Sequence, residues 1–150
     1  MPAQLNIIGA HLYFERDGHV LLGLRAPGAA FAGNVWHVPA GHVEHESVRA
    51  CAVREAAEEL GITVAARDLE MVHTVHVLDG VETGGGQPRL GVFFRVRRWD
   101  GEPKVMEPDR CVRWQWWPLC SLPNPTVPYT VAALEGIVNG WSYTDMGWEQ

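Results

Sequence analysis

The stretch from Gly41 to Ile62, GHVEHESVRACAVREAAEELGI, constrains the fold of this chain more than any other. If it is helical, Glu55, Glu58 and Glu59 fall within an arc of roughly 100°, because each residue turns a helix by about 100°. An apolar set at helical spacing lies on the opposite side and predicts the core-facing surface: Ala50, Val53, Ala56, Ala57 and Leu60.

The ends of this helix are also marked in the sequence. Ser47 is a residue type that caps helix N-termini, and Gly61 is the type that stops them. Within the helix, Glu55 and Glu59 form a like-charge pair four residues apart, which costs a few tenths of a kcal/mol. Either the acidic face is simply solvated, or it binds a cation that reverses the repulsion.

The net charge of the chain limits the kinds of ligand that such a helix could bind. The 150 residues carry a formal charge of −6, so the chain lacks the cationic surface that nucleic-acid polymers require. An acidic site would need a cation before a phosphate could approach it. The length suits one domain covering residues 1–150.

The three cysteines, Cys51, Cys111 and Cys120, are widely spaced and form no CxxC pair. This argues against a disulfide framework or a zinc site and favours a reducing, cytoplasmic compartment. The first residues lack a basic region followed by a long apolar stretch, so we expect no signal peptide. No apolar run approaches the roughly 20 residues of a membrane helix, so we expect no membrane partner.

Strand patterns surround the acidic helix. Asp17-Gly18 predicts a tight turn between two strands, and Pro39-Ala40-Gly41 is expected to end a short strand. The aromatic tail, 141–150, could cover the site or contact a partner subunit, which leaves a homodimer open. Strands are predicted at 5–15, 20–25, 35–38, 62–64, 71–78, 90–99 and 112–117, and a second helix at 129–139. This order suits an α/β fold in which helices cover both faces of a mixed sheet.

The spacing of the acidic helix closely resembles the Nudix box: glycine, five residues, glutamate, seven residues, then Arg-Glu-U-x-Glu-Glu-x-Gly-U, where U is a bulky aliphatic residue. The residues from Arg54 to Ile62 match its second half. Two departures occur: only four residues separate Gly41 from Glu46, and Ala56 replaces a larger aliphatic residue. The resemblance extends from about Leu5 to Gly140 and implies a Nudix-type α/β/α sandwich.

The resemblance also implies roles for individual residues. Arg54 would orient the glutamates, and Glu46 would support the loop before the helix. Glu107 would join the metal or act as a base, with Glu82 as the weaker alternative, and the general base could equally be Glu59 or Glu55. The implied metal ligands are Glu55, Glu58, Glu59 and the carbonyl of Ala40, and the implied substrate contacts are Arg25 and Asn124.

Carboxylate oxygens suit Mg²⁺, with Mn²⁺ as a substitute, and Mg²⁺ helps water attack a diphosphate by neutralising its oxygens. His37, His42 and His45 match no zinc pattern, so we expect polar loop residues or phosphate contacts there.

The resemblance therefore implies a Mg²⁺-dependent pyrophosphohydrolase acting on a small nucleotide. A MutT-like nucleoside triphosphate hydrolase, including one acting on oxidised dGTP, is the first hypothesis. A nucleotide-sugar or dinucleoside polyphosphate hydrolase is the second. A non-catalytic, nucleotide-binding regulatory module is the third, although such modules usually lose box glutamates and this chain retains them.

Overall fold

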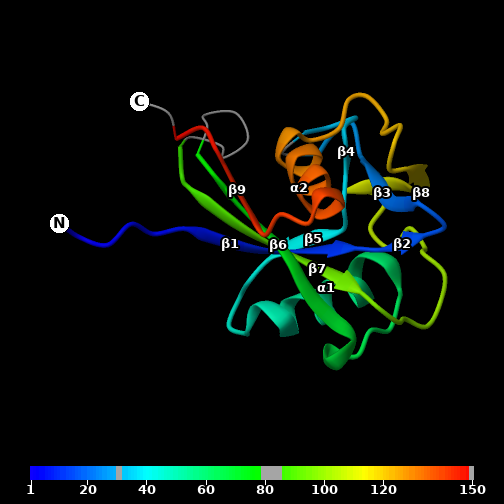
Figure 1. The fold of residues 1–150 in the computed structure, drawn as a ribbon. Helices are drawn as coiled ribbons and strands as arrows, with labels where there is room; N and C mark the ends of the chain where they lie inside the picture. Colours follow the sequence, from blue (N-terminus) through cyan, green and yellow to red (C-terminus); the bar gives the residue numbers. More distant parts are fainter. Residues whose placement is uncertain (30–31, 79–85, 149–150) are drawn as a thin grey trace.

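Two sheets and two helices make up the fold seen in the computed structural model, which describes residues 1–29, 32–78 and 86–148 (Figure 1). Glu82 lies outside these described residues, so the expectation for it stays untested. No helix in the described ranges is long and apolar enough to cross a membrane.

The larger sheet has five strands in the order β5-β1-β7-β6-β9. β1 pairs with β7, and β6 with β9, in parallel, while the remaining pairs are antiparallel. The expectation of a mixed sheet is therefore confirmed. Its strands are β5 (Ala40–His42), β1 (Ile7–Tyr13), β7 (Arg89–Val96), β6 (Leu69–Val77) and β9 (Tyr143–Met146).

The smaller sheet lies at the opposite end of the molecule from the two chain termini (Figure 1). Its central strand, β3, pairs antiparallel with the other three strands. Asp17 and Gly18 both have positive φ, 50° and 74°, as the predicted two-residue turn requires. The strands are β2 (Glu15–Arg16), β3 (His19–Arg25), β4 (Trp36–His37) and β8 (Cys111–Pro118).

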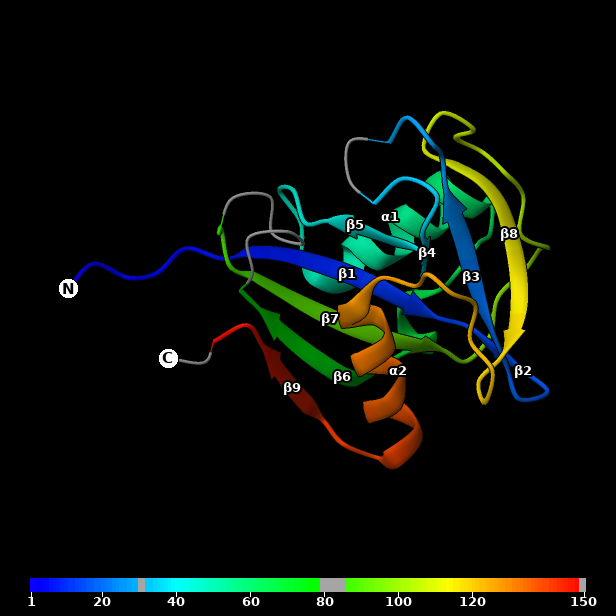
Figure 2. The same ribbon diagram turned by 90° about the horizontal axis from the view of Figure 1, so that it is seen from above.

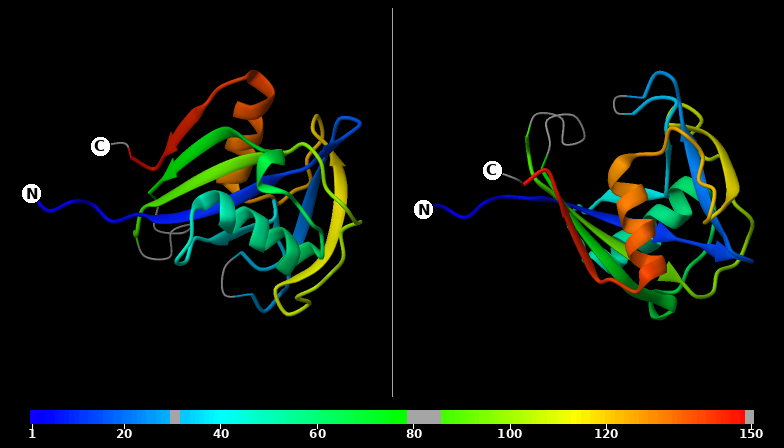
Figure 3. Two further views of the ribbon diagram at one scale, coloured as in Figure 1. Left: turned by 90° about the horizontal axis from the view of Figure 1, so that it is seen from below. Right: turned by 45° about the horizontal axis from the view of Figure 1, so that its top comes forward.

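The helices cover opposite faces of the larger sheet: α2 (Pro128–Asn139) lies on one face in Figure 2, and α1 (Val48–Leu60) lies on the other in Figure 3. Alternation along β1 explains both cores, because Ala10 and Leu12 pack with α1, whereas Tyr13 packs with α2. The fold is thus the expected α/β/α sandwich. A short 3₁₀ helix, Ala66–Asp68, follows α1.

The caps of α1 are as expected. The Ser47 hydroxyl accepts a hydrogen bond from the Ala50 amide, and Gly61 has a left-handed φ of 67°. The predicted core face was wrong in part, since Ala50 and Ala57 are exposed and the carboxylate-bearing Glu55 is buried. The sheet lies against a helical face rotated toward Cys51, Ala52 and Ala56.

Three other expectations need correction. The short strand β4 ends at His37, before the expected break at Pro39, but Ala40–His42 then forms a further strand, the edge strand β5, because its backbone pairs with β1. Residues 62–64 make only one isolated bridge, between Thr63 and Asp100. The tail extends the sheet as β9, and Trp148 packs against His76 with ring centroids 4.5 Å apart.

Candidate active site

Arg54 is the centre of the polar network on α1. Its guanidinium donates two hydrogen bonds to Glu46, at 2.9 and 2.5 Å, one to Glu55 at 2.8 Å and one to Glu58 at 3.1 Å. It also donates to the His42 carbonyl at 3.2 Å. The paired bonds from Arg54 hold the pKa of Glu46 down to about 2. Arg54 thus links the side chains of Glu55 and Glu58 to the loop that precedes α1.

The loop between Gly41 and Glu46 is one residue shorter than the Nudix pattern, yet Glu46 still reaches Arg54. The Glu44 amide donates to the Glu46 carboxylate at 3.2 Å, which closes the short turn. In the shortened loop, the Glu46 carboxylate is therefore held by both Arg54 and the Glu44 amide.

Glu55 and Glu59 lie close together on α1, and the Ala40 amide donates a hydrogen bond to the Glu59 carboxylate at 3.0 Å. Glu55 is buried, and Glu59 is partly buried. Burial raises the pKa of Glu59 well above its ordinary range, and the neighbouring charge of Glu55 adds to this effect. Burial also raises the pKa of Glu55. A cation beside the two carboxyl groups would favour their ionised forms.

Gly41 is required by the close approach of Glu55 to the edge strand. A Cβ atom built at Gly41 would lie 2.1 Å from the carboxyl carbon of Glu55. Any larger residue at this position would therefore displace Glu55 from its place beside Glu59.

Glu107 precedes β8 and reaches the same region. Its negative charge also raises the pKa of Glu59, so the two side chains interact electrostatically across the site. Glu107 therefore lies near the helical pair.

Within the described residues, no group of three or more His, Cys, Asp and Glu side chains is placed to hold a metal ion. Glu58 instead pairs with Arg54 and is half exposed. The donors that do converge, Glu55 and Glu59, are oxygen ligands in a buried like-charge pair, which suits a hard divalent cation such as Mg²⁺. The residues present therefore fit the metal that the family pattern implies.

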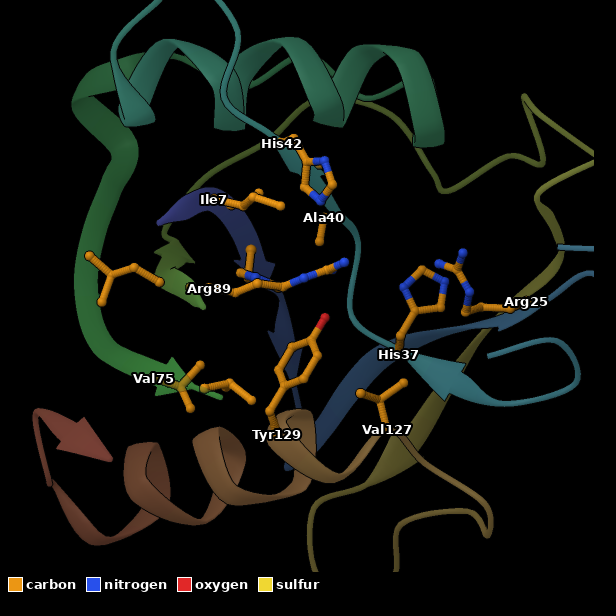
Figure 4. A pocket seen from close by; sticks show the side chains of 15 residues that line it. Ile7, Arg25, His37, Ala40, His42, Val75, Arg89, Val127 and Tyr129 are labelled. Carbon is orange, nitrogen blue, oxygen red and sulfur yellow. The ribbon is translucent and has the colours of Figure 1, made fainter. Parts of the chain in front are cut away.

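On the α2 side of the sheet lies a cavity of about 200 Å³. Figure 4 shows Arg89 and Tyr129 pointing into it from opposite walls, with Arg25 and His37 at one end. Ala40, whose amide holds Glu59, is also part of its lining. The cavity and the carboxyl pair thus meet at the edge strand β5.

The polar groups of this cavity are cationic or neutral. Arg25, at the end of β3, is one of the lining residues. Burial, together with the charge of Arg89, lowers the pKa of His42, the next lining residue after Gly41. Asn124 is exposed and does not belong to the lining, which Val127 and Tyr129 complete from the same segment.

Sequence reasoning did not identify Arg89, Tyr129 or His11 as part of this site. His11 could have been found, because it is a polar residue within an otherwise apolar strand, IIGAHLY. Arg89 and Tyr129 carry no such signal, since each is an ordinary residue near the start of a strand or helix.

Comparisons with known proteins identify the family. The family model described as NUDIX domain matches residues 7–133. A MutT Nudix hydrolase from Burkholderia pseudomallei has 31% identity and a TM-score of 0.77, covering 88% of this chain and 98% of that protein. The ORF135 protein of E. coli has 26% identity and a TM-score of 0.71, covering 91% of each chain.

A third structure, the Nudix domain of Shewanella oneidensis NrtR in complex with ADP ribose, has 19% identity and a TM-score of 0.69. The alignment covers 93% of this chain and 89% of that one, and shows a shared fold. Together with the box geometry on α1, these matches show that the chain belongs to the Nudix family and is a MutT-like pyrophosphohydrolase.

Proposed function

We propose that this chain is a Mg²⁺-dependent hydrolase that cleaves a diphosphate bond in a nucleoside triphosphate. The observation that carries this proposal is the shared position of Ala40, which contacts the Glu55–Glu59 region through its amide and lines the cationic cavity. A substrate in the cavity can thereby extend its phosphates across β5 toward the carboxyl pair.

The arginines of the cavity would bind the substrate. Arg25 and Arg89 line it from the ends of two different strands, so their positive charges attract a phosphate chain that the acidic helix alone would repel. Their planar guanidinium groups also suit bidentate hydrogen bonds to phosphate oxygens.

The carboxylates would complete the reaction centre. Glu55, Glu58, Glu59 and the Ala40 carbonyl are the proposed metal ligands, and the metal, when bound, would acidify a water and neutralise the phosphate oxygens. Glu58 would have to leave its 3.1 Å contact with Arg54 to take part. Glu59, with its raised pKa, can accept a proton from the attacking water, and Glu107 is the second candidate for this role.

Other nucleotides that contain a diphosphate bond are alternative substrates. The NrtR domain was crystallised with ADP ribose, so a nucleotide-sugar substrate is the second candidate for this related fold. The retained carboxylates argue against a purely regulatory module. The free state of Cys51, Cys111 and Cys120 supports a cytoplasmic location for the enzyme.

The test is a panel of nucleoside triphosphates, nucleotide sugars and dinucleoside polyphosphates, incubated with Mg²⁺ or Mn²⁺ and followed by product identification. We expect a nucleoside monophosphate plus pyrophosphate from the triphosphates. Release of a sugar phosphate plus a nucleoside monophosphate would instead support the second candidate. Binding without any product would contradict the proposal.

A further inference from the structure

The ring of His37 is buried in the wall of the cavity. His37 lies in β4 and is 6% exposed, so the expectation of a polar loop residue at this position was wrong. Its Nε2 is closed to solvent and has no hydrogen-bond partner in the part of the chain that the structure describes. An unpaired buried polar atom costs free energy, so native structures rarely keep one without a reason. Because solvent does not reach this atom, we look for its partner among the neighbouring side chains.

The hydrogen bond at the other ring nitrogen fixes the tautomer of His37. Its Nδ1 lies 2.6 Å from the carbonyl oxygen of Val38, and a carbonyl can only accept, so Nδ1 carries the ring proton. Burial, with a contribution from the charge of Arg25, lowers the pKa of His37 to about 3. The ring is therefore neutral at pH 7, and its Nε2 can only accept a hydrogen bond.

The register of the smaller sheet places Arg25 beside this acceptor. His37 is opposite Gly23 of β3, and Arg25 is two residues further along β3, so its side chain leaves the same face of the sheet. Diagonal neighbours of this kind are within reach of a long side chain, and Gly23 has no side chain to come between them. Figure 4 shows the guanidinium of Arg25 next to the imidazole of His37, at one end of the cavity.

The backbone around Arg25 is held by both neighbouring strands. The register between β3 and β8 shifts between Leu24 and Arg25, which leaves Val112 without an opposite residue on β3. Such bulges re-aim a side chain and are common beside active sites. On the other side, the Arg25 amide donates to the Val35 carbonyl at 3.0 Å. The backbone thus brings Arg25 to the cavity, whereas the direction of its guanidinium depends on side-chain contacts.

A second donor also lies near His37. The indole N–H of Trp114 is buried and has no partner within residues 1–29, 32–78 and 86–148, and its ring centroid is 5.8 Å from that of His37. A hydrogen bond from a charged donor is about twice as strong as one from a neutral donor. Arg25 is therefore the better partner for Nε2, and Trp114 is the alternative that an experiment has to exclude.

We propose that His37 is a positioning residue for Arg25: its neutral Nε2 accepts a hydrogen bond from the guanidinium and thereby turns the remaining N–H groups toward the substrate phosphates. A guanidinium carries five N–H donors in a rigid plane, so one bond to His37 sets the direction of the others. A protonated ring could not do this, because it would present a second N–H to the arginine. The inference rests on the proposed action on nucleotides, in which Arg25 binds the phosphate chain.

A double-mutant cycle tests whether His37 acts through Arg25. With a nucleoside triphosphate that the wild type hydrolyses, His37→Leu should raise KM about tenfold and change kcat by no more than about threefold, because it removes a bond to a charged group that binds substrate. In an Arg25→Ala background, the same substitution should change KM by no more than about twofold, because the group that it positions is absent. His19→Gln, at a turn residue bonded to the Asp17 carbonyl, is the matched control.

Rescue by a conservative variant separates positioning from packing. His37→Gln places an amide oxygen near the position of Nε2, so its KM should stay within about threefold of the wild-type value. A packing role alone would raise KM equally with and without Arg25, and the inference would then be overturned. Coupling of His37→Leu to Trp114→Phe but not to Arg25→Ala would overturn it as well. His37→Met replaces His37→Leu if the latter shows no cooperative melting.

Binding of inorganic pyrophosphate separates this inference from the proposed function. In titration calorimetry without metal, His37→Leu should weaken binding about tenfold in the wild-type background and by no more than about twofold beside Arg25→Ala. If no nucleotide is hydrolysed but pyrophosphate binding shows this coupling, the proposed function fails and the inference stands. If nucleotides are hydrolysed but neither KM nor pyrophosphate binding shows the coupling, only the inference is overturned. If no nucleotide is hydrolysed and pyrophosphate does not bind, both fail.

Discussion

The two faces of the five-stranded sheet differ in the charged side chains that lie on them and in the partners of those side chains. On the α1 face, the Arg54 guanidinium donates hydrogen bonds to several carboxylates, and the carboxyl groups of Glu55 and Glu59 lie close together. On the α2 face, the cavity combines arginines with neutral imidazoles and aromatic rings. The first arrangement suits a cation and a reacting water, and the second suits the recognition of an anionic, aromatic ligand.

Under the proposed function, the edge strand β5 lies between the reaction centre and the recognition cavity. All three residues of β5 line the cavity, while Gly41 also adjoins Glu55 and the Ala40 amide also donates to Glu59. Changes on the α1 face should therefore alter turnover, whereas changes on the α2 face should alter the choice and binding of substrate. Four substitutions test this division.

The largest effect is expected for Glu59→Gln. Loss of a proton acceptor should lower kcat by about 10²–10⁴-fold. The amide can still accept from Ala40 and can donate to Glu55, which relieves the buried like-charge pair. The metal-free variant should therefore melt about 2–4 °C higher, equivalent to about 1 kcal/mol. Steady-state kinetics and thermal melting with a chelator measure both quantities, and unchanged turnover would remove Glu59 from the reaction.

Gly41→Ala should have the next largest effect. Its new methyl group would overlap the Glu55 carboxyl, and a displacement of about 1 Å in a reaction centre can cost about 10²-fold in rate. Gly28→Ala is the matched control, because a Cβ at Gly28 meets no atom of residues 1–29, 32–78 and 86–148 within 4 Å. Equal activity of the two variants would show that the position of Glu55 does not limit turnover.

Arg54→Lys should have an intermediate effect. Lysine keeps the charge but cannot make the paired bonds to Glu46 while also reaching Glu55. Loss of such supporting bonds typically lowers metal affinity or activity by about 10–100-fold. A titration of activity against Mg²⁺ concentration measures this, with the exposed Arg98→Lys as control. An unchanged titration curve would argue that the carboxylates hold their positions without Arg54.

Asn124→Ala should have the smallest effect. Because Asn124 is exposed and lies outside the cavity lining, we expect KM to rise by no more than about threefold, as for a surface substitution. Tyr129→Phe, which removes one hydroxyl from within the cavity, is the comparison. A rise in KM of tenfold or more for Asn124→Ala would mean that this loop closes on the substrate.

Much of the fold followed from local patterns. The caps at Ser47 and Gly61 and the turn at Asp17-Gly18 were predicted because a few adjacent residues determine them. The face of α1 was predicted incorrectly in part, because Ala50 and Ala57 are apolar but small, and their exposure costs little. The strand role of Ala40–His42 was missed because it depends on pairing with β1, about thirty residues earlier in the sequence.

The acidic cluster on α1 can be predicted from local sequence. Arg54, Glu55 and Glu59 lie within six consecutive residues, and the periodicity of one helix is enough to bring them together. The composition of the cavity depends instead on the tertiary fold, because His11, Arg89 and Tyr129 come from separate elements. The parallel pairing of β1 with β7 places His11 opposite Phe93 in the sheet, and α2 then brings Tyr129 against the His11 ring. Such long-range pairing depends on the packing of the whole sheet, which no local pattern contains.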